Sequence, residues 1–545
     1  MQRQLPYSIQ HWLKCALILC LGLVLSACHR LPPRMPVQSS YYLTNTADTQ
    51  LGHLLEPQKA QHKGLTGYQL LIDPIGAIAA RLILIEKAQK SLDLQYYIWH
   101  NDKVGALTLE ALLRAADRGV RVRLLLDDNN TDDLDSSLLA LSQHPNIEVR
   151  LFNPFVYRKW RVLNYVLDLK RNNRRMHNKT FIADSQVALI GGRNISNQYY
   201  DAGESFQFSD IDVLLVGKVV PEIAQSFDSY WNYPMAYPAQ QMIDAGQHSL
   251  NLAQLRRQLE DYHATIPAQN YLELAKEQAE FNNWLGGQPQ LEWVPAHLVQ
   301  DSPEKIDKHT NRDEHLGFQL QNLVGEPSQQ LDIISAYFVP ANTGTAALIR
   351  LKKKGVRVRV LTNSYAANDV GIVHAFYAKR RKELIKNGIE LYEFLPQLKT
   401  VQRRYFRKDR IRLLGSNSHS ANTGSINTGS GIGDSSDASL HAKMMVFDRQ
   451  QAFIGSFNFD PRSANLNTEI GVILDSPKLA TQVSQDLDNS ILSIAYRVRL
   501  DENGKMIWEE KTPEGIKIHT REPNIKPVTR VGLKMIAKLP LDGFM

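Results

Sequence analysis

The chain has 545 residues, which is enough for about three to four domains at roughly 150 residues each. Hydrophobic residues make up 43% of it and charged residues 22%, so a sizeable core is possible, and no stretch reaches the ~18 apolar residues that a membrane-spanning helix needs. The formal net charge of +7 is mild for this length: it suits an anionic lipid surface but does not demand nucleic acid.

The first 28 residues have the pattern of a secretory leader. Arg3 and Lys14 form a basic region, and an apolar run of 11 residues follows from Cys15 to Leu25, which is too short to span a membrane. The run ends in Leu-Ser-Ala-Cys, which resembles the lipobox where bacterial lipoproteins are cleaved and acylated. We therefore expect a signal peptide at 1–27 and a lipid on Cys28; an uncleaved signal anchor is the alternative.

The leader also predicts where the protein resides. All three cysteines lie within it, so the mature body has no thiol for a disulfide. The lipoprotein resemblance implies a membrane anchor on the periplasmic side of the bacterial cell envelope. His29 replaces the aspartate that commonly retains lipoproteins at the inner membrane, which favours the outer membrane, although lipid synthesis would suit the inner one. The Pro-rich segment 28–64 is expected to be a flexible, lipid-anchored tether.

Beyond residue 65 the chain repeats itself, with five segment pairs in one order. The pairs are SLDLQYYIW with QLDIISAYFVP, GVRVRLLLDD with GVRVRVLTNS, NIEVRLFNP with GIELYEFLP, HNKTFIAD with HAKMMVFD, and ALIGGRNIS with AFIGSFNFD. Such agreement indicates an internal duplication. We expect a first repeat at 65–235, a helical connecting insert at 236–310, a second repeat at 311–497 with a flexible Ser/Asn/Gly-rich loop at 415–439, and a C-terminal tail at 498–545.

Each repeat alternates helical stretches with strand-like runs. Apolar residues recur at helical spacing in AIAARLILIEKAQ and TLEALLRAADRG, and a run rich in Val, Ile and Leu follows each stretch. This alternation is typical of βαβ units. The sequence therefore predicts the α/β class twice, each time a mostly parallel mixed sheet flanked by helices.

Two HxKxxxxD boxes occupy equivalent places in the two repeats. Their candidate catalytic residues are His177, Lys179 and Asp184 in the first, and His441, Lys443 and Asp448 in the second. We expect the His and Lys of each box to share one face of a strand. An ammonium repels a metal cation but balances a phosphate oxyanion while an imidazole attacks phosphorus, so the pair favours a phosphate site. An aspartate that ends such a box more often holds the turn than touches the substrate.

Shortly after each box, a tight turn precedes an asparagine. The candidate phosphate-binding residues at these turns are Gly192, Asn194, Ser456 and Asn458. Backbone N–H groups and amide donors at such turns can reach the same anion, although a serine there is more often a turn cap. No metal and no other cofactor is expected.

The residues HNKTFIAD…GGRN and HAKMMVFD…GSFN resemble the phospholipase D superfamily. The stretch GSFNFDPRSANLNTE and the LPLDGF end are similar to its cardiolipin synthase C-like branch. The resemblance implies two phospholipase D-like repeats packed as a pseudo-dimer. It also implies transfer of a phosphatidyl group between phospholipids, with phosphatidylglycerol and phosphatidylethanolamine as the expected substrates.

The resemblance also implies a role for each site residue. His177 would be the nucleophile and His441 the general acid and base, while the lysines and asparagines hold the phosphate oxygens. The family needs an acid to orient each imidazole. Glu469 supplies one, and Asp210 aligns with it in the first repeat, with Asp212 as the rival.

Other functions remain open at this point. A phospholipase D hydrolase would use the same site with water as the acceptor. A nucleic-acid phosphodiesterase is less favoured, because the charge is mild and both boxes lie in one chain, and no nucleic-acid partner is expected. A lipoprotein without catalytic activity would not need intact His, Lys and Asn in both repeats. No protein partner can be named.

Three further sequence patterns each allow two interpretations. The run DDNNTDD from Asp127 to Asp133 is either a cation loop or, as favoured, a set of turn and cap residues. The basic, aromatic stretches 157–179 and 402–412 are either solvated faces or contacts for a lipid headgroup or membrane surface. The aromatic strand ends could wall the site or lie in the core; they are Tyr96, Tyr97, Trp99, Tyr337 and Phe338.

Overall fold

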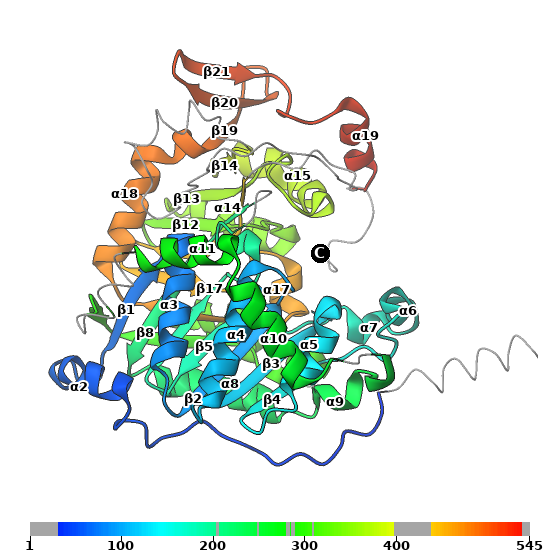
Figure 1. Ribbon diagram of the computed structural model, residues 1–545. Helices are drawn as coiled ribbons and strands as arrows, with labels where there is room; N and C mark the ends of the chain where they lie inside the picture. The colour runs from blue at the N-terminus through cyan, green and yellow to red at the C-terminus, as the bar shows by residue number, and fades with distance from the viewer. Residues whose placement is uncertain are drawn as a thin grey trace, which may run out of the picture.

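The computed structural model describes residues 31–536, apart from 203–206, 248–249, 279–283, 285–288, 308–309 and 397–437. Figure 1 shows two large mixed sheets with their helices, the first repeat (blue to green) below the second (yellow to red). The predicted α/β class is confirmed. The signal peptide and Cys28 lie outside the described residues, as does most of the Ser/Asn/Gly-rich loop.

The first repeat contains a nine-stranded sheet. From edge to edge its strands are β10 (Glu292–Val294), β1 (Thr66–Leu71), β8 (Asp212–Gly217), β6 (Val187–Gly191), β5 (Thr180–Ala183), β2 (Ser91–Ile98), β3 (Arg121–Asn130), β4 (Ile147–Phe152) and β9 (Ala236–Pro238).

The second repeat contains a ten-stranded sheet of similar order. Its strands are β11 (Ala296–Gln300), β18 (Ile470–Leu474), β17 (Gln451–Gly455), β16 (Lys443–Phe447), β12 (Gln330–Ser335), β13 (Arg357–Asn363), β14 (Glu390–Phe394), β19 (Ala495–Leu500), β20 (Met506–Thr512) and β21 (Gly515–His519). A small parallel pair, β7 (Gln207–Ser209) with β15 (Ala438–Leu440), joins the repeats, so the last residues of the expected loop form a strand.

Antiparallel pairs outnumber parallel pairs in both sheets, which corrects the expectation of mostly parallel sheets. Within the described parts of these two sheets, parallel pairing is confined to β2–β3–β4 and β12–β13–β14. The strands after each box, β5–β6 and β16–β17, pair antiparallel. The reason is the length of their connections: residues 184–186 and 448–450 are too few for the crossover that parallel neighbours require.

Helices cover the outer face of each sheet. Those of the first repeat are α3 (Pro74–Lys87), α4 (Lys103–Asp117) and α5 (Asp135–Leu141), and those of the second are α14 (Ala341–Lys353) and α15 (Gly371–Lys386). Gly119 after α4 and Gly355 after α14 both have φ of 93°, a conformation that favours glycine, and both lead directly into a parallel strand.

A shared core joins the inner faces of the two sheets. It contains Ile190 and Val213 from the first sheet beside Ile454 and Val472 from the second. Helices α8 (Val220–Asn232) and α18 (Pro477–Ile494) complete it. The two repeats are therefore fused through apolar side chains, which fixes the surfaces where the boxes meet.

The N-terminal segment is packed on the first repeat from residue 31 onward, which corrects the expectation of a free tether. Arg34 donates to the carbonyl oxygen of Tyr233 at 3.1 Å, and Trp231 Nε1 donates to Ser40 Oγ at 2.9 Å. Helix α2 (Gln50–Gln61) then buries Leu51. Figure 1 shows this segment running along the lower edge of the molecule. These hydrogen bonds to α8 and to the residue just after it hold the segment against the first repeat.

The segments expected as a helical insert and as a tail also contribute strands. Beside the helices α9 (Ala239–Met242), α10 (Leu252–His263) and α11 (Ile266–Lys276), the insert supplies β10 to the first sheet and β11 to the second. Helix α13 (Leu316–Val324) follows. The C-terminal segment adds β20 and β21 to the second sheet, and α19 (Pro527–Ile536) contacts α15.

Candidate active site

Both box histidines lie where the two repeats meet. His177 N–H donates to the carbonyl oxygen of Thr468 at 2.9 Å, and His441 N–H donates to that of Ser209 at 2.7 Å. Each bond crosses to the other repeat, so neither histidine belongs to a strand of its own sheet: β5 begins at Thr180 and β16 at Lys443. This corrects the expectation that the His and Lys of each box lie together on a strand.

Each imidazole is held by a carboxylate from the opposite repeat. His177 Nδ1 donates to Glu469 at 2.8 Å, and His441 Nδ1 donates to Asp210 at 2.5 Å. Asp212 instead accepts from Arg81 at 2.8 Å, away from both histidines. Because the carboxylate accepts a hydrogen bond from Nδ1–H, the proton of each neutral imidazole stays on Nδ1 and Nε2 keeps its lone pair for chemistry.

The residues Gly192 and Ser456 position these carboxylates. A Cβ at Gly192 would lie 2.2 Å from Asp210 Oδ1, so only glycine leaves room for that side chain. Ser456 Oγ donates to Glu469 at 2.5 Å. Their own N–H groups donate to backbone carbonyls, at 3.3 and 2.8 Å. The expectation that these two residues bind phosphate is therefore revised: each serves the carboxylate.

The two asparagines differ in whether their side-chain amides are already hydrogen-bonded within the protein. Asn194 Nδ2 donates to Tyr199 at 2.8 Å, and its Oδ1 accepts from the N–H of Ile98 at 3.0 Å. Asn458 is buried, and its Oδ1 has no partner among the described residues. The Nδ2 group of Asn458 likewise makes no hydrogen bond to the rest of the described chain, so it remains available to donate to a ligand, whereas the amide of Asn194 is committed to the protein.

Four potential cations are buried together in this site. Burial lowers the pKa of His177 to about 4 and that of Lys179 to about 7, against the opposing charge of Glu469. Burial and the neighbouring lysines also hold the pKa of His441 well below its usual range, and burial lowers the pKa of Lys443. An anion between these groups would reverse part of each shift, which makes the site suited to phosphate.

The two box aspartates lie at the far ends of the strands that follow the lysines. Asp184 accepts from the N–H groups of Lys90 and Ser91 at 2.7 and 2.9 Å. Asp448 accepts from those of Gln329 and Gln330 at 2.7 and 2.8 Å. Each carboxylate therefore caps the start of a parallel strand, as expected for an aspartate that holds the turn. Neither carboxylate is hydrogen-bonded to a box histidine.

Comparisons with known proteins agree with this geometry. The family model described as "Cardiolipin synthase, PLD-like domain" matches residues 82–231 and 320–491, more than half of the chain. Cardiolipin synthase C of Escherichia coli (strain K12) is 41% identical over 489 residues, which cover 90% of this chain and 98% of that protein. The chain belongs to the cardiolipin synthase family of phospholipase D-like proteins.

Other relatives support the same assignment. Cardiolipin synthase B of Shigella flexneri is 24% identical over 80% of this chain and 83% of its own length. The crystal structure of phosphatidylserine synthase from Haemophilus influenzae Rd KW20 has the same fold, with a TM-score of 0.53 and 14% identity over 90% of this chain and 99% of that one. The family-model match and the 41% identical relative confirm the predicted superfamily membership.

Aromatic side chains line the site of this cardiolipin synthase family member. The Tyr97 ring lies 5.0 Å from the His177 ring, and the Tyr199 ring lies 5.1 Å from that of His441. The Tyr337 hydroxyl donates to Asp369 at 2.7 Å. The other aromatic strand ends, Tyr96, Trp99 and Phe338, are buried in the hydrophobic cores. Tyr97 therefore lines the site, whereas Tyr96, Trp99 and Phe338 belong to the core, so each of the two interpretations of the aromatic pattern applies to part of it.

Three further residues position the site, and of these the sequence pattern had pointed only to Asp127, as part of a possible cation loop or turn. Asp301, in the connecting insert, accepts from the N–H of Glu469 at 2.9 Å. Arg193 donates to the carbonyl oxygen of Asp210 at 2.7 Å, and its place between Gly192 and Asn194 was the available signal. Asp127 of the DDNNTDD run accepts from the N–H of Met176 at 2.8 Å. That run therefore orders the segment before His177, and the described residues contain no group of acids, histidines and cysteines suited to a metal.

Proposed function

We propose that this protein is a phosphatidyltransferase of cardiolipin synthase type, which transfers a phosphatidyl group between phospholipids through a phosphohistidine. The observation that carries the proposal is the crossed pair of imidazole–carboxylate contacts, His177 with Glu469 and His441 with Asp210, beside two buried lysines. One anionic phosphodiester can satisfy all of these groups at once.

In the first step, Nε2 of His177 attacks phosphorus and the bond from phosphorus to the leaving alcohol breaks. His441 donates a proton to the departing alkoxide. Binding of the substrate anion raises the depressed pKa of His441, so the imidazole can carry that proton in the complex. In the second step, His441 takes the proton of the acceptor hydroxyl, the acceptor oxygen attacks phosphorus, and the bond to His177 breaks.

Lys179, Lys443 and Asn458 are the proposed phosphate ligands. The Lys443 ammonium lies 3.0 Å from Nδ1 of His441, and both lysines also donate to the carbonyl oxygen of their own box histidine. Their charges would balance the oxyanion of the transition state. Tyr97 and Tyr199 would exclude water and support the glycerol part of a lipid, so that an alcohol acceptor competes with water.

The proposed substrates are phosphatidylglycerol and phosphatidylethanolamine, and the proposed location is the periplasmic side of the cell envelope, with Cys28 acylated. The lipobox-like sequence supports the anchor, and the mild positive charge suits an anionic membrane. Within the described part of the chain, no helix is long and apolar enough to cross a membrane. We favour the outer membrane because His29 stands where an aspartate commonly retains lipoproteins at the inner membrane. Fractionation of cells that produce the wild type or Cys28→Ser tests this location.

The function is tested with purified protein and vesicles that contain labelled phosphatidylglycerol with and without phosphatidylethanolamine. Cardiolipin is the expected main product, and phosphatidic acid should be minor. If phosphatidic acid dominates even with abundant phosphatidylglycerol, the protein is a phospholipase D hydrolase instead. His441→Asn should accumulate an acid-labile mass adduct on His177; an adduct on residue 441 of a His177→Asn variant would reverse the two roles.

A further inference from the structure

A short projection with exposed apolar side chains stands out on the first repeat. It consists of residues 159–170, with helix α6 (Arg161–Leu167) and the first turn of α7 (Leu169–Asn172), and Figure 1 shows both helices protruding at the right-hand edge. Its exposed apolar side chains are Trp160 (71% exposed), Val162 (77%), Val166 (75%) and Leu169 (51%). Four such side chains within ten residues form an exposed apolar patch, which is typical of an interaction site.

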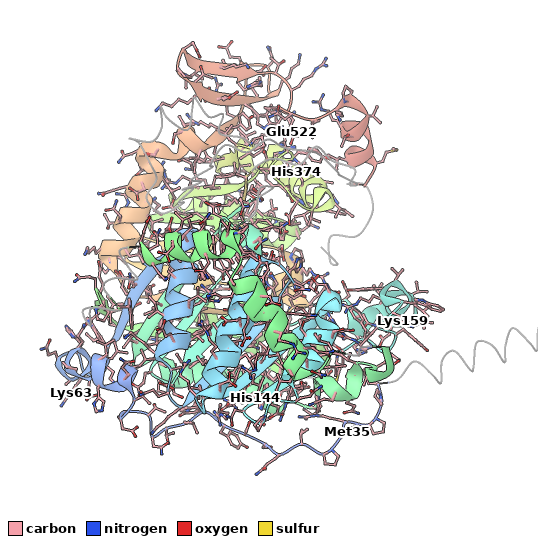
Figure 2. The ribbon with its side chains drawn as sticks, in the orientation of Figure 1. Met35, Lys63, His144, Lys159, His374 and Glu522 are labelled. Carbon is pink, nitrogen blue, oxygen red and sulfur yellow. The ribbon has the colours of Figure 1, made fainter. Side chains whose placement is uncertain are left out.

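The charged side chains of the projection differ in exposure. Arg158, just before it, pairs with Asp128 and Asp135, and Arg161 donates to the backbone oxygen of Asn129 at 2.9 Å. These arginines therefore hold the projection against the protein. Lys159 and Lys170, by contrast, are exposed within the same twelve residues as the apolar side chains, and Figure 2 shows Lys159 at the outer edge.

The projection lies beside the active site. Tyr165 of α6 donates to Asn129 Oδ1 at 2.6 Å, and Asn129 Nδ2 donates to the Tyr97 hydroxyl at 3.3 Å. The Tyr97 ring contacts the His177 ring. Three contacts thus link the apolar helix to the proposed nucleophile.

The chain's N-terminal segment reaches the same side. The Tyr237 hydroxyl donates to the carbonyl oxygen of Pro32 at 3.0 Å. Just before Tyr237, the carbonyl oxygen of Met235 accepts from Asn153 N–H at 2.9 Å, and Asn153 Nδ2 donates to the carbonyl oxygen of Arg171 in α7 at 3.2 Å. Tyr237 therefore lies near both the N-terminal segment and α7. Cys28 is four residues before Pro32, a reach of about 14 Å at full extension, so its acyl chains would enter a membrane near the projection.

We propose that residues 159–170 insert into the surface of an anionic phospholipid bilayer, with their apolar side chains below the headgroups and Lys159 and Lys170 on the phosphates. This inference rests on the proposed lipid substrate and adds the surface through which the site meets it. Tryptophan and aliphatic side chains flanked by lysines are suited to this boundary. Docking here turns the His177 side of the site toward the lipids.

Insertion can be measured without catalysis. All three cysteines lie in the first 28 residues, so Val166→Cys places the sole thiol in the rest of the chain. An environment-sensitive label there should report an apolar environment, and quenching by nitroxide lipids, when the full-length protein is reconstituted in vesicles of phosphatidylethanolamine and phosphatidylglycerol. The matched control is Ile518→Cys on β21, which is 53% exposed at the opposite end of the molecule. A label at residue 166 that stays in water overturns the proposal, as does one already shielded without vesicles, which would indicate a protein partner or a second copy.

Turnover gives an independent readout. The variant Trp160→Ser/Val162→Ser/Val166→Ser should lose about tenfold or more in turnover on vesicles. The acyl anchor still retains this variant at the membrane, but the altered projection no longer orients the active site toward the lipids. Turnover on the same lipids dispersed in detergent should stay unchanged, and Ile516→Ser/Ile518→Ser should match the wild type in both assays. An equal loss in detergent and on vesicles overturns the docking role. If no phosphatidyl transfer occurs at all, the labelling result still decides whether the projection inserts.

Discussion

At the scale of single residues, the two halves of the site achieve the same contact by different means. Glu469 reaches His177 and is held by Ser456, whereas the shorter Asp210 reaches His441 across the space that Gly192 leaves. Burial, the largest single influence, raises the pKa of Glu469, but His177, Lys179 and Ser456 together hold it below its usual range. Glu469 is therefore an anion at neutral pH, as an orienting acid must be.

The glycine at position 192 gives a sharp prediction. Gly192→Ala should lower kcat by about 100-fold or more, because the new Cβ displaces Asp210 and turns His441 from its productive orientation. Kinetics on phosphatidylglycerol vesicles measure the effect, and thermal unfolding shows whether the fold survives. Gly532→Ala, where a Cβ meets nothing within 4 Å, is the matched control. Wild-type activity in Gly192→Ala would refute the proposed role of Asp210.

The pH dependence should follow two groups of the free site. Below about pH 4, His177 is protonated and cannot attack; above about pH 7, Lys179 loses the charge that binds phosphate. The profile of kcat/KM should therefore fall on both sides of this window, while bound phosphate moves the alkaline limb of kcat to higher pH. Lys179→Arg, which stays charged, should shift the alkaline limb of kcat/KM upward. An alkaline limb that does not move would exclude Lys179 as its source.

At the scale of elements, the box aspartates connect the catalytic segments to the parallel strands. Asp184→Ala would leave the N–H groups at the start of β2 without their acceptor, at a cost of about 2–3 kcal/mol in the free energy of unfolding. Urea denaturation measures that loss, and kcat per folded molecule should stay near the wild-type value at low temperature. Asp48→Ala, at an exposed ion pair, serves as the control. A large loss of kcat at unchanged stability would instead make Asp184 catalytic.

Helix α6 shows how an element can differ from its sequence pattern. The stretch 157–179 is strongly basic, which left open whether it is a solvated face or a contact for a lipid headgroup or membrane surface. In the structure, Arg158, Arg171 and Arg175 bind Asp128, Asp168 and Asp127, and four apolar side chains are exposed beside Lys159 and Lys170. Local charge density could not show which basic side chains stay exposed, because Asp128 and Asp127, which bind Arg158 and Arg175, lie 30 and 48 residues away in the chain.

At the scale of the whole molecule, the repeats share one site. The orienting acid of His177 is 292 residues away in the chain, and that of His441 is 231 residues away. The common core and the β7–β15 pair hold the repeats together. Neither repeat contains a complete imidazole–carboxylate pair of its own.

The shared site predicts how single substitutions behave. His177→Ala or His441→Ala alone should lower turnover by about 1000-fold or more, since each histidine is needed once per cycle. Radiolabelled cardiolipin formation measures this, and Asn458→Ala should show a smaller loss with a raised KM. Two independent sites would leave about half of the activity in each single variant, a result that would exclude the shared site.

The sequence by itself determined the duplication, the α/β class, the boxes and the family, because motif order and strand patterns are local properties of the chain. Tertiary structure alone decided between Asp210 and Asp212, assigned Gly192 and Ser456 to the acids, and left Asn458 rather than Asn194 free for a ligand. It also decided that short hairpins make the sheets largely antiparallel and that residues 31–64 pack on the first repeat. Each imidazole–carboxylate contact joins segments 231 or 292 residues apart in the chain, and a spacing within one repeat cannot specify which carboxylate from the other repeat will meet each histidine.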